Sequence, residues 1–287
     1  MVMQGVDSHC HVFDTTLFPY STEASYQPPP HEAGTAVQLT AVLDAHGLSH
    51  ALLVNPTSGY FYDNRCMLAA IRGSNGRFKG IARVRPGTDE RTMAELADGG
   101  VIGLRLDLLT DGVASLSDPA TNRLLAQARE MRWLVQVQCE RDQLREAAAA
   151  LRAVRVPLVF DHCGRPDAAL GIDQPGFEAL LEFGREGHYV KLSGPFRFFN
   201  AFARRARIEP FVTALIETFT PARCVWGSDW PFLRLPLRTD YGPVLADLER
   251  WFPDERDRRQ VLWDTPARLF GFGRADAIVG RRRMLEQ

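Results

Sequence analysis

The chain has 287 residues, of which 45% are hydrophobic and 24% charged, with 34 basic and 35 acidic side chains. These are the proportions of a soluble globular protein, and they exclude a mainly disordered chain. A formal net charge of -1 gives no electrostatic reason to bind nucleic acid. We expect the one basic run, the arginines at 281–283, to be a solvated tail.

The five cysteines are scattered and form no CxxC pair, which argues against a disulfide framework or a structural zinc site and favours a reducing compartment. The first residues lack the basic region and apolar run of a signal peptide. No apolar run reaches the roughly 18 residues of a membrane span. We therefore expect a cytoplasmic protein without a membrane partner, and a homo-oligomer is left open.

Short runs rich in Val, Ile and Leu alternate along the chain with segments of helical period. We expect strands near residues 5–13, 50–57, 78–86, 101–109, 134–140, 157–164, 188–194 and 223–230, with helices in most of the gaps. Eight βα units in a chain close to the roughly 250 residues usual for a barrel predict one (β/α)8 TIM barrel domain over residues 1–287. No GxGxxG or GxxxxGK[ST] motif is present, which excludes the common nucleotide-binding folds.

The least regular stretch is residues 14–34, which lie between the first strand and a helix expected near 36–46. It contains several prolines and aromatic side chains, among them Tyr26. A connection of this length is unusual in a compact domain and is often functional. We expect a lid over the barrel mouth, with Tyr26 as a candidate substrate contact; a surface loop without a role is the alternative.

Two histidines close the first strand, within the sequence DSHCH at 7–11. Residues two apart on a strand point to the same face, so His9 and His11 should project together at the carboxyl end of the barrel, where active sites of this fold lie. Such a pair can hold a metal ion or polarise a substrate carbonyl group.

Two further strands end in titratable groups. Strand six runs into DHCGRPD at 161–167, which places His162 at the rim and Arg165 in a turn from which it can bind an anion. A salt bridge from Arg165 to Asp161 or Asp167 is the structural alternative. Strand eight ends in WGSDWP at 226–231, where we expect aromatic neighbours to raise the basicity of Asp229 toward that of a general base.

Polar side chains on other strands complete the candidate site. Arg105 and Asp107 share one face of strand four, either as an internal ion pair or with Arg105 binding substrate. Arg197 follows strand seven, and Gln138 shares a face of strand five with Gln136. The glutamine can orient a substrate or fill a polar layer.

Together these motifs resemble the amidohydrolase superfamily, and within it the branch of lactone hydrolases that includes the 2-pyrone-4,6-dicarboxylate lactonases. The similar segments are DSHCH at 7–11, the strand at 103–105, DHCGRPD at 161–167, KLSG at 191–194, WGSDWP at 226–231 and the closing segment 264–271. The resemblance implies a distorted barrel in which Asp229 deprotonates the attacking water while His9, His11 and His162 polarise the lactone carbonyl. It also implies that Arg105, Arg165 and Arg197 bind substrate carboxylates.

The resemblance bears on cofactors and substrate as well. Strand four has no lysine and strand five has no histidine, so we do not expect a binuclear metal centre. We expect that no metal is required. His9, His11 and Asp229 could nevertheless hold zinc or another divalent ion. The second strand-four arginine of the pattern is replaced by Asp111 and the strand-five tyrosine by Gln138. We therefore expect a small lactone with one carboxylate, rather than the dicarboxylate itself.

Two alternatives remain at this stage. One is a metal-dependent amide hydrolase or decarboxylase of the same superfamily, which stoichiometric zinc would favour. The other is a barrel that binds a metabolite without catalysis, against which the carboxylate of Asp229 speaks. A fold alone cannot decide among them, because barrels host many reactions.

Overall fold

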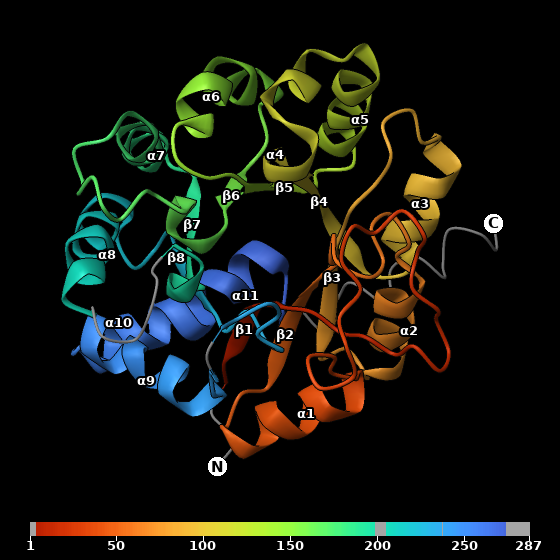
Figure 1. Cartoon of the computed structure of the whole chain (residues 1–287), viewed down its shortest axis with the longest axis horizontal. Coiled ribbons are helices and arrows are strands. Elements are labelled where there is room, and N and C mark those ends of the chain that lie inside the picture. Colours follow the sequence, from red (N-terminus) through yellow and green to blue (C-terminus); the bar gives the residue numbers. More distant parts are fainter. Residues whose placement is uncertain (1–3, 199–204, 237, 274–287) are drawn as a thin grey trace, which may run out of the picture.

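The computed structural model describes residues 4–198, 205–236 and 238–273. Its centre is an eight-stranded parallel sheet in which the strands follow their order in the chain. The strands are β1 (Val6–Cys10), β2 (His50–Val54), β3 (Phe78–Ala82), β4 (Val101–Asp107), β5 (Leu134–Gln138), β6 (Leu158–Phe160), β7 (Tyr189–Ser193) and β8 (Cys224–Gly227). Each lies within one of the ranges predicted from the apolar runs, so the (β/α)8 barrel is confirmed (Figure 1). The arginines at 281–283 lie outside the described residues.

The barrel closes where the chain leaving β8 returns to β1. Cys10 forms a parallel bridge with Trp230. Two backbone hydrogen bonds join the segments: the amide of His11 donates to the carbonyl of Trp230 at 2.9 Å, and the amide of Asp229 donates to the carbonyl of His9 at 2.8 Å. The closure lies beyond the end of β8, and it places Asp229 directly beside His9 of β1 and His11, which follows β1.

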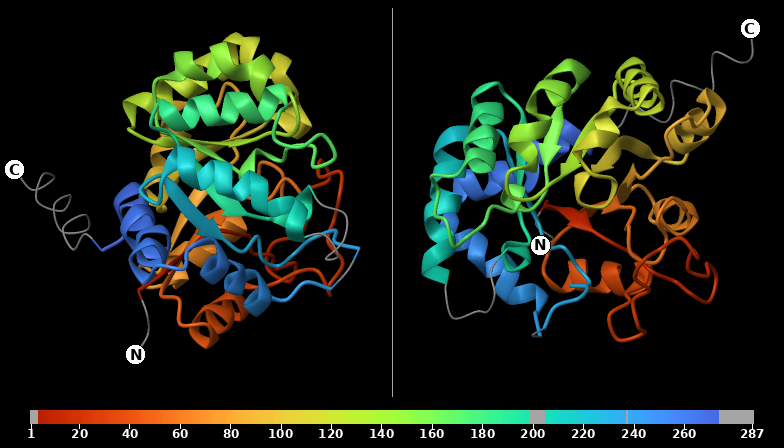
Figure 2. Two further views of the ribbon diagram at one scale, coloured as in Figure 1. Left: turned by 90° about the vertical axis from the view of Figure 1, so that its left-hand side faces the viewer. Right: turned by 45° about the horizontal axis from the view of Figure 1, so that its top comes forward.

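Helices surround the strands on the outside, as both views in Figure 2 show. They are α1 (Ala36–Ala45), α2 (Arg65–Gly73), α3 (Glu90–Asp98), α4 (Leu108–Asp111), α5 (Pro119–Glu130), α6 (Gln143–Val154), α7 (Pro175–Arg185), α8 (Arg205–Phe219), α9 (Tyr241–Trp251), α10 (Glu255–Arg259) and α11 (Thr265–Phe270). Within the described parts of the chain, no helix has both the length and the apolar character needed to cross a membrane.

The barrel interior changes from apolar to polar along the strands. On β5, Leu134 belongs to the apolar cluster at the base, whereas Gln136 and Gln138 follow on the same face. On β7, Tyr189 lies in the same cluster and Lys191 follows, with no exposed surface. The apolar layer thus supplies hydrophobic burial at one end, and the polar layer above it carries the groups available for chemistry.

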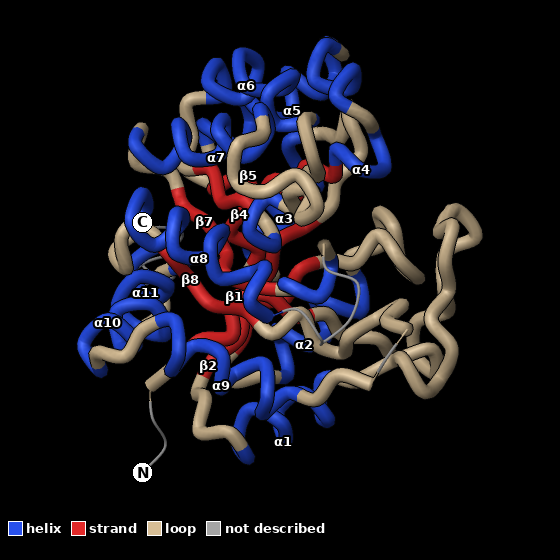
Figure 3. Tube along the Cα trace, turned by 60° about the vertical axis from the view of Figure 1, so that its left-hand side comes forward, coloured by secondary structure: helices blue, strands red, loops and turns tan. Residues whose placement is uncertain are grey.

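The long connection between β1 and α1 packs on the connection that follows β2. The rings of Phe13, Tyr20 and Tyr60 form a cluster with centroids 5.5 to 6.2 Å apart. The backbone amide of Gly59 donates to the carbonyl of Tyr26 at 2.7 Å. Figure 3 shows this connection among the long loops gathered at one end of the barrel. Its Ser25 lines the cavity described below; whether it closes over a substrate stays a prediction.

Candidate active site

A cavity of about 530 Å³ opens at the carboxyl end of the barrel. It is the size of a small-molecule site. Seven of the residues predicted from the sequence line it: His11, Arg105, Gln138, His162, Arg165, Arg197 and Asp229. The strand ends therefore bring together side chains that are more than 200 residues apart in the chain.

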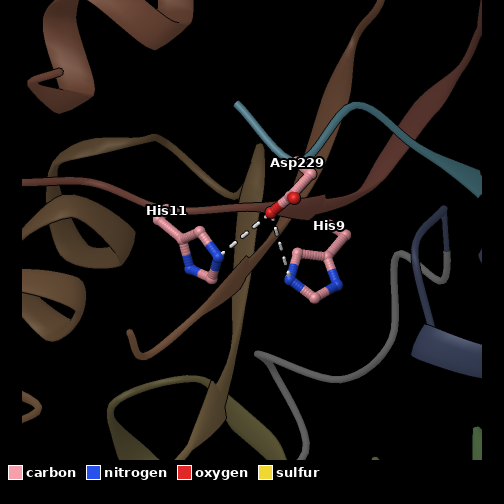
Figure 4. Close-up of side chains that lie close together, drawn as sticks. All are labelled: His9, His11 and Asp229. Carbon is pink, nitrogen blue, oxygen red and sulfur yellow. Dashed lines mark ion pairs between the residues drawn. The ribbon is translucent and has the colours of Figure 1, made fainter. Parts of the chain in front are cut away.

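The carboxylate of Asp229 is the centre of this site. Its Oδ1 lies 3.4 Å from Nε2 of His11 and 3.8 Å from Nε2 of His9 (Figure 4). Its Oδ2 lies 4.0 Å from Nε2 of His162 and 2.5 Å from Nε of Arg197, which donates a hydrogen bond to it. The rings of His9 and His11 are 5.0 Å apart, which confirms that they project together from β1. Asp229 is 1% exposed, so these interactions are shielded from water.

The other ring nitrogens of the two β1 histidines face the protein. Nδ1 of His11 lies 2.7 Å from the carbonyl oxygen of Val54, which can only accept, so this nitrogen carries a proton. Nδ1 of His9 lies 3.2 Å from Asp161 Oδ1 and 3.3 Å from Lys191 Nζ. Nε2 of His9 is buried and has no hydrogen-bond partner within the described parts of the chain. Both Nε2 atoms are thus aimed at Asp229.

A buried polar network supports His9 from below. Nζ of Lys191 donates to Oε1 of Gln136 at 2.6 Å and lies 3.5 Å from Asp161, while Nε2 of Gln136 donates to Asp161 Oδ2 at 2.8 Å. Burial lowers the pKa of Lys191 to about 8, although Asp161 opposes the shift. Burial also lowers the pKa of His9 well below its usual value, and Lys191 adds to this effect. His9 is therefore neutral at pH 7.

The expected rise in the basicity of Asp229 is wrong. Burial does raise the pKa of its carboxyl group, but Arg197, His162, His11 and His9 together outweigh burial and hold the pKa well below the usual value. The flanking aromatic rings do not enclose the carboxylate: Trp226 belongs to the core outside the barrel and packs on Tyr241, with ring centroids 5.8 Å apart. The dominant neighbours of the carboxylate are cations and histidines rather than apolar rings.

His162 lies at the start of a turn rather than on a strand. It has a φ of 50°, in the left-handed region, and Cys163 follows with a φ of 56°. This backbone turns the ring into the cavity, where its Nδ1 lies 3.0 Å from Oγ of Ser193. Burial lowers the pKa of His162 to about 4, so the ring is neutral at pH 7. When Ser193 donates to Nδ1, the proton of the neutral ring is on Nε2, which faces Asp229.

The predicted arginines all reach the cavity, with partners that differ from the expected ones. Arg105 forms no ion pair with Asp107. Its Nη2 lies 3.6 Å from Asp161, and its Nε is buried without a hydrogen-bond partner in the part of the chain that the structure describes. Arg165 pairs with Glu140 at 3.2 Å rather than with an aspartate of its own turn. Each guanidinium group therefore keeps donors available for an anion.

Asp111 does not take the place of a substrate-binding arginine. Its Oδ1 accepts a hydrogen bond from Nη2 of Arg83 at 2.5 Å, and it does not line the cavity. The guanidinium group of Arg83 stacks on Phe61, 4.1 Å from the ring centroid. This ion pair is a structural feature beside the barrel mouth.

Tyr26 lies outside the residues that line the cavity. Its hydroxyl group donates to Glu32 at 2.6 Å, and its ring packs under the guanidinium group of Arg234, 4.9 Å away. Arg234 itself lines the cavity, so Tyr26 supports a lining residue. The sequence analysis missed Arg234, because the loop after β8 has no periodic pattern that places it.

Two threonines at the mouth were also missed. Thr57 follows β2 and Thr110 lies in α4, and both line the cavity. Their partner is Asp107, which accepts hydrogen bonds from the hydroxyl groups of Thr57 at 2.5 Å and Thr110 at 2.8 Å. The NPT sequence at 55–57, a polar end to an apolar strand, was the signal that could have identified Thr57.

Comparisons with known proteins agree with this geometry. The model of the amidohydrolase family matches residues 6–272. The chain is 31% identical to a 4-sulfomuconolactone hydrolase of Hydrogenophaga intermedia, over 92% of this chain and 88% of the relative. It is 30% identical to a 2-pyrone-4,6-dicarboxylate hydrolase of Comamonas testosteroni, over 93% and 90%. A crystal structure described as a probable 2-pyrone-4,6-dicarboxylic acid hydrolase of Acinetobacter baumannii, with citric acid bound, superposes with a TM-score of 0.85 and 28% identity, over 94% of this chain and 100% of that one.

The barrel and the polar groups at its mouth therefore define an enzyme of the amidohydrolase family, to which the chain belongs. More narrowly, its relatives are lactone hydrolases, and the chain is a hydrolase that acts on a cyclic ester.

Proposed function

We propose that this protein opens a small anionic lactone with a water molecule that Asp229 deprotonates. The observation that carries the proposal is the position of one buried carboxylate among three histidines and Arg197, in a cavity of about 530 Å³. The chemistry of ester hydrolysis needs a base for water and a donor for the carbonyl oxygen, and both lie within one cavity.

The arginines supply the reason for an anionic substrate. Arg105, Arg165, Arg197 and Arg234 all line the cavity. A guanidinium group binds a carboxylate or sulfonate with parallel charge-assisted hydrogen bonds, which fix the orientation of the ring as well as its position. The names of the relatives, which act on a sulfomuconolactone and a pyrone dicarboxylate, support this class of substrate.

The reaction follows from the donors and acceptors around Asp229. The water oxygen adds to the lactone carbonyl carbon as the proton of the water passes to the carboxylate. His162, as the tautomer protonated on Nε2, donates to the carbonyl oxygen on which negative charge develops. In the tetrahedral intermediate, the bond between the carbonyl carbon and the ring oxygen then breaks. The ring oxygen takes the proton that Asp229 accepted from the water. The product is an open-chain acid.

His9, His11 and Asp229 also form a fitting set of ligands for a divalent ion, which supports a metal-dependent hydrolase as the second candidate. Their ligand atoms lie within 4.8 Å of one another, and Nε2 of His9 is buried without a hydrogen-bond partner among residues 4–198, 205–236 and 238–273. Zinc bonds of about 2.0–2.1 Å place tetrahedral ligands roughly 3.4 Å apart, close to the 3.4 and 3.8 Å measured from Asp229 Oδ1. A bound zinc ion would lower the pKa of a water molecule and polarise a carbonyl group. We propose that hydrolysis does not require it.

One experiment tests both candidates. Proton release is measured on pyrone carboxylates, muconolactones and aldonolactones, with wild type and Asp229→Asn, before and after treatment with a chelator. We expect chelator-resistant hydrolysis, which falls by about 10²–10⁴-fold in the variant because the base is lost. Full activity of Asp229→Asn removes this residue from the role of base. Stoichiometric zinc together with loss of activity on chelation establishes the metal-dependent candidate instead.

A further inference from the structure

The wall of the cavity formed by Thr57, Asp107 and Thr110 differs in chemistry from the arginine side. Asp107 ends β4 and is 2% exposed. Its Oδ2 accepts hydrogen bonds from Oγ1 of Thr57 at 2.5 Å and of Thr110 at 2.8 Å. Its Oδ1 accepts one from the backbone amide of Thr110 at 3.3 Å, which makes Asp107 the cap of α4.

These contacts leave the wall with acceptors only. A threonine hydroxyl group has one proton, and both threonines donate theirs to Asp107, so each Oγ1 presents only lone pairs to the cavity. The carboxylate has no proton to donate either, and its two oxygens offer about four acceptor positions for the three donors that it binds. We call Thr57, Asp107 and Thr110 the acceptor wall.

Gln138 extends the acceptor wall onto the next strand. It pairs with Asp107 in the register of β4 and β5, and it lines the same cavity. Its Oε1 is buried and has no hydrogen-bond partner among the described residues. A buried acceptor without a donor is costly unless a ligand supplies one. Gln138 therefore places an unsatisfied acceptor, and the amide donors of its Nε2, beside the wall.

We propose that the acceptor wall binds a hydroxyl group of the substrate, so that the substrate is a lactone with one anionic group and at least one hydroxyl group. The anion binds the arginine side, and the hydroxyl donates to the Asp107 side. A second carboxylate at the wall would face Asp107 and find no donor among the three wall residues. A cationic group would suit the wall but not the four arginines that share the cavity. This inference rests on the proposed lactone hydrolysis and names its substrate class.

The test compares matched lactones. D-glucaro-1,4-lactone and D-galactaro-1,4-lactone carry one carboxylate and three hydroxyl groups. The lactone (5-oxotetrahydrofuran-2-yl)acetate has the same ring and carboxylate but no hydroxyl group. We expect kcat/KM for the better hydroxylated lactone to exceed that for the deoxy lactone by at least about 10²-fold, since a site built to hydrogen-bond a hydroxyl group rejects the analogue without it. A deoxy lactone or pyrone dicarboxylate hydrolysed faster than both overturns the inference but leaves lactone hydrolysis intact. No hydrolysis of any of these lactones overturns the proposed function as well.

The variant Asp107→Asn tests whether the acceptor wall causes the preference for hydroxylated over deoxy lactones. Asparagine keeps the volume and an oxygen for the α4 cap, but it replaces one carboxylate oxygen by a donor. We expect the ratio of kcat/KM, hydroxylated over deoxy, to fall at least about tenfold. A merely structural role of Asp107 lowers both rates in parallel, leaves the ratio unchanged and overturns the assignment. Asp111→Asn, which changes a neighbouring carboxylate outside the cavity, is the matched control. Gln138→Leu carries the same test if Asp107→Asn does not fold.

Discussion

At the scale of the residue, Arg197 connects the proposed base Asp229 to the proposed binding of a substrate anion. A general base works best with a pKa near the operating pH. Burial raises the pKa of Asp229, and Arg197, whose Nε lies 2.5 Å from the carboxylate, is the first of the neighbours that together lower it. A substrate anion that binds the guanidinium group of Arg197 partly neutralises its charge, which weakens its effect on the pKa of Asp229. We infer that Asp229 becomes more basic when substrate is bound, so that binding and base strength are coupled through one arginine.

This coupling predicts the effect of Arg197→Gln on the pH dependence of the free enzyme. Removal of the cation disfavours the carboxylate, so the pKa of Asp229 rises and the acid limb of kcat/KM moves to higher pH. The shift should be at least about one pH unit, the lower end of what a neighbouring arginine causes. The measurement is a profile of kcat/KM from pH 8 to below pH 4, because the wild-type limb lies below the usual carboxyl pKa of 3.8. Arg197→Lys keeps the positive charge, so the acid limb of its kcat/KM profile should stay at the wild-type pH. If the acid limb of Arg197→Gln also stays there, the coupling is contradicted.

The residues of the site were largely predictable, but their partners were not. The two-residue spacing of His9 and His11 and the polar ends of the apolar strands follow from local rules, so the sequence indicated them directly. The direction of the pKa shift of Asp229 depends on Arg197, 32 residues away in the chain. The ion pair of Arg165 with Glu140 is likewise set by tertiary packing. Electrostatic effects therefore needed the structure.

At the scale of the element, the positions of the strands were predictable and their ends were not. Each apolar run marks a strand, because a buried parallel strand is apolar on both faces. The predicted strand at 157–164 is observed only as β6 (Leu158–Phe160). His162 and Cys163, which follow it, have φ values of 50° and 56°, a strained conformation that composition does not reveal. The strand ends early where the chain turns the histidine into the site.

The carboxylate of Asp7 holds β1 against the segment that follows β8. Asp7 accepts four hydrogen bonds: from the backbone amides of His9 at 3.1 Å and Ser228 at 2.9 Å, from Oγ of Ser228 at 2.5 Å and from the hydroxyl group of Tyr241 at 2.9 Å. Asp7 has no exposed surface. Asp7 therefore ties together the first strand, the segment before Asp229 and α9.

Asp7→Ala should lower the free energy of unfolding by at least about 3 kcal/mol, because it leaves several buried donors without a partner. Tyr241→Phe removes only one of the four bonds and should cost about 1 to 2 kcal/mol. Urea denaturation of both variants beside wild type gives the two values. Equal losses of unfolding free energy in the two variants would show that Asp7 does not hold β1 and the segment after β8 together.

At the scale of the whole molecule, the barrel separates stability from chemistry. The apolar layer at the base and the core between strands and helices bury hydrophobic surface, whereas the polar layer at the mouth holds charged and neutral titratable groups out of water. Burial of such groups costs free energy unless each has a partner. His9 and His162 meet this cost by remaining neutral, which ties the stability of the whole fold to pH.

The sign of that dependence follows from His162 and His9. An unfolded histidine titrates near 6.5, whereas burial lowers the pKa of folded His162 to about 4 and that of His9 well below its usual value. Between these values the unfolded chain binds protons that the folded chain does not, so stability is greatest above pH 6.5 and falls as the pH decreases. His162 alone should reduce the free energy of unfolding by about 3 kcal/mol between pH 7 and pH 4. The carboxyl groups of Asp161 and Asp229, whose pKa values are also lowered, add a loss only below about pH 3.8.

Urea denaturation at pH 7, 6, 5 and 4 measures this slope, with His162→Asn as the variant and His31→Asn, at an exposed position, as the control. His162→Asn has no imidazole to charge on unfolding, so its stability should fall less steeply over this range than that of wild type, whereas His31→Asn should keep the wild-type slope. A stability of His162→Asn that falls in parallel with wild type would mean that the folded protein protonates His162 as readily as the unfolded chain does. In that case the neutral ring, and with it the donor assigned to the lactone carbonyl, would have to be reconsidered.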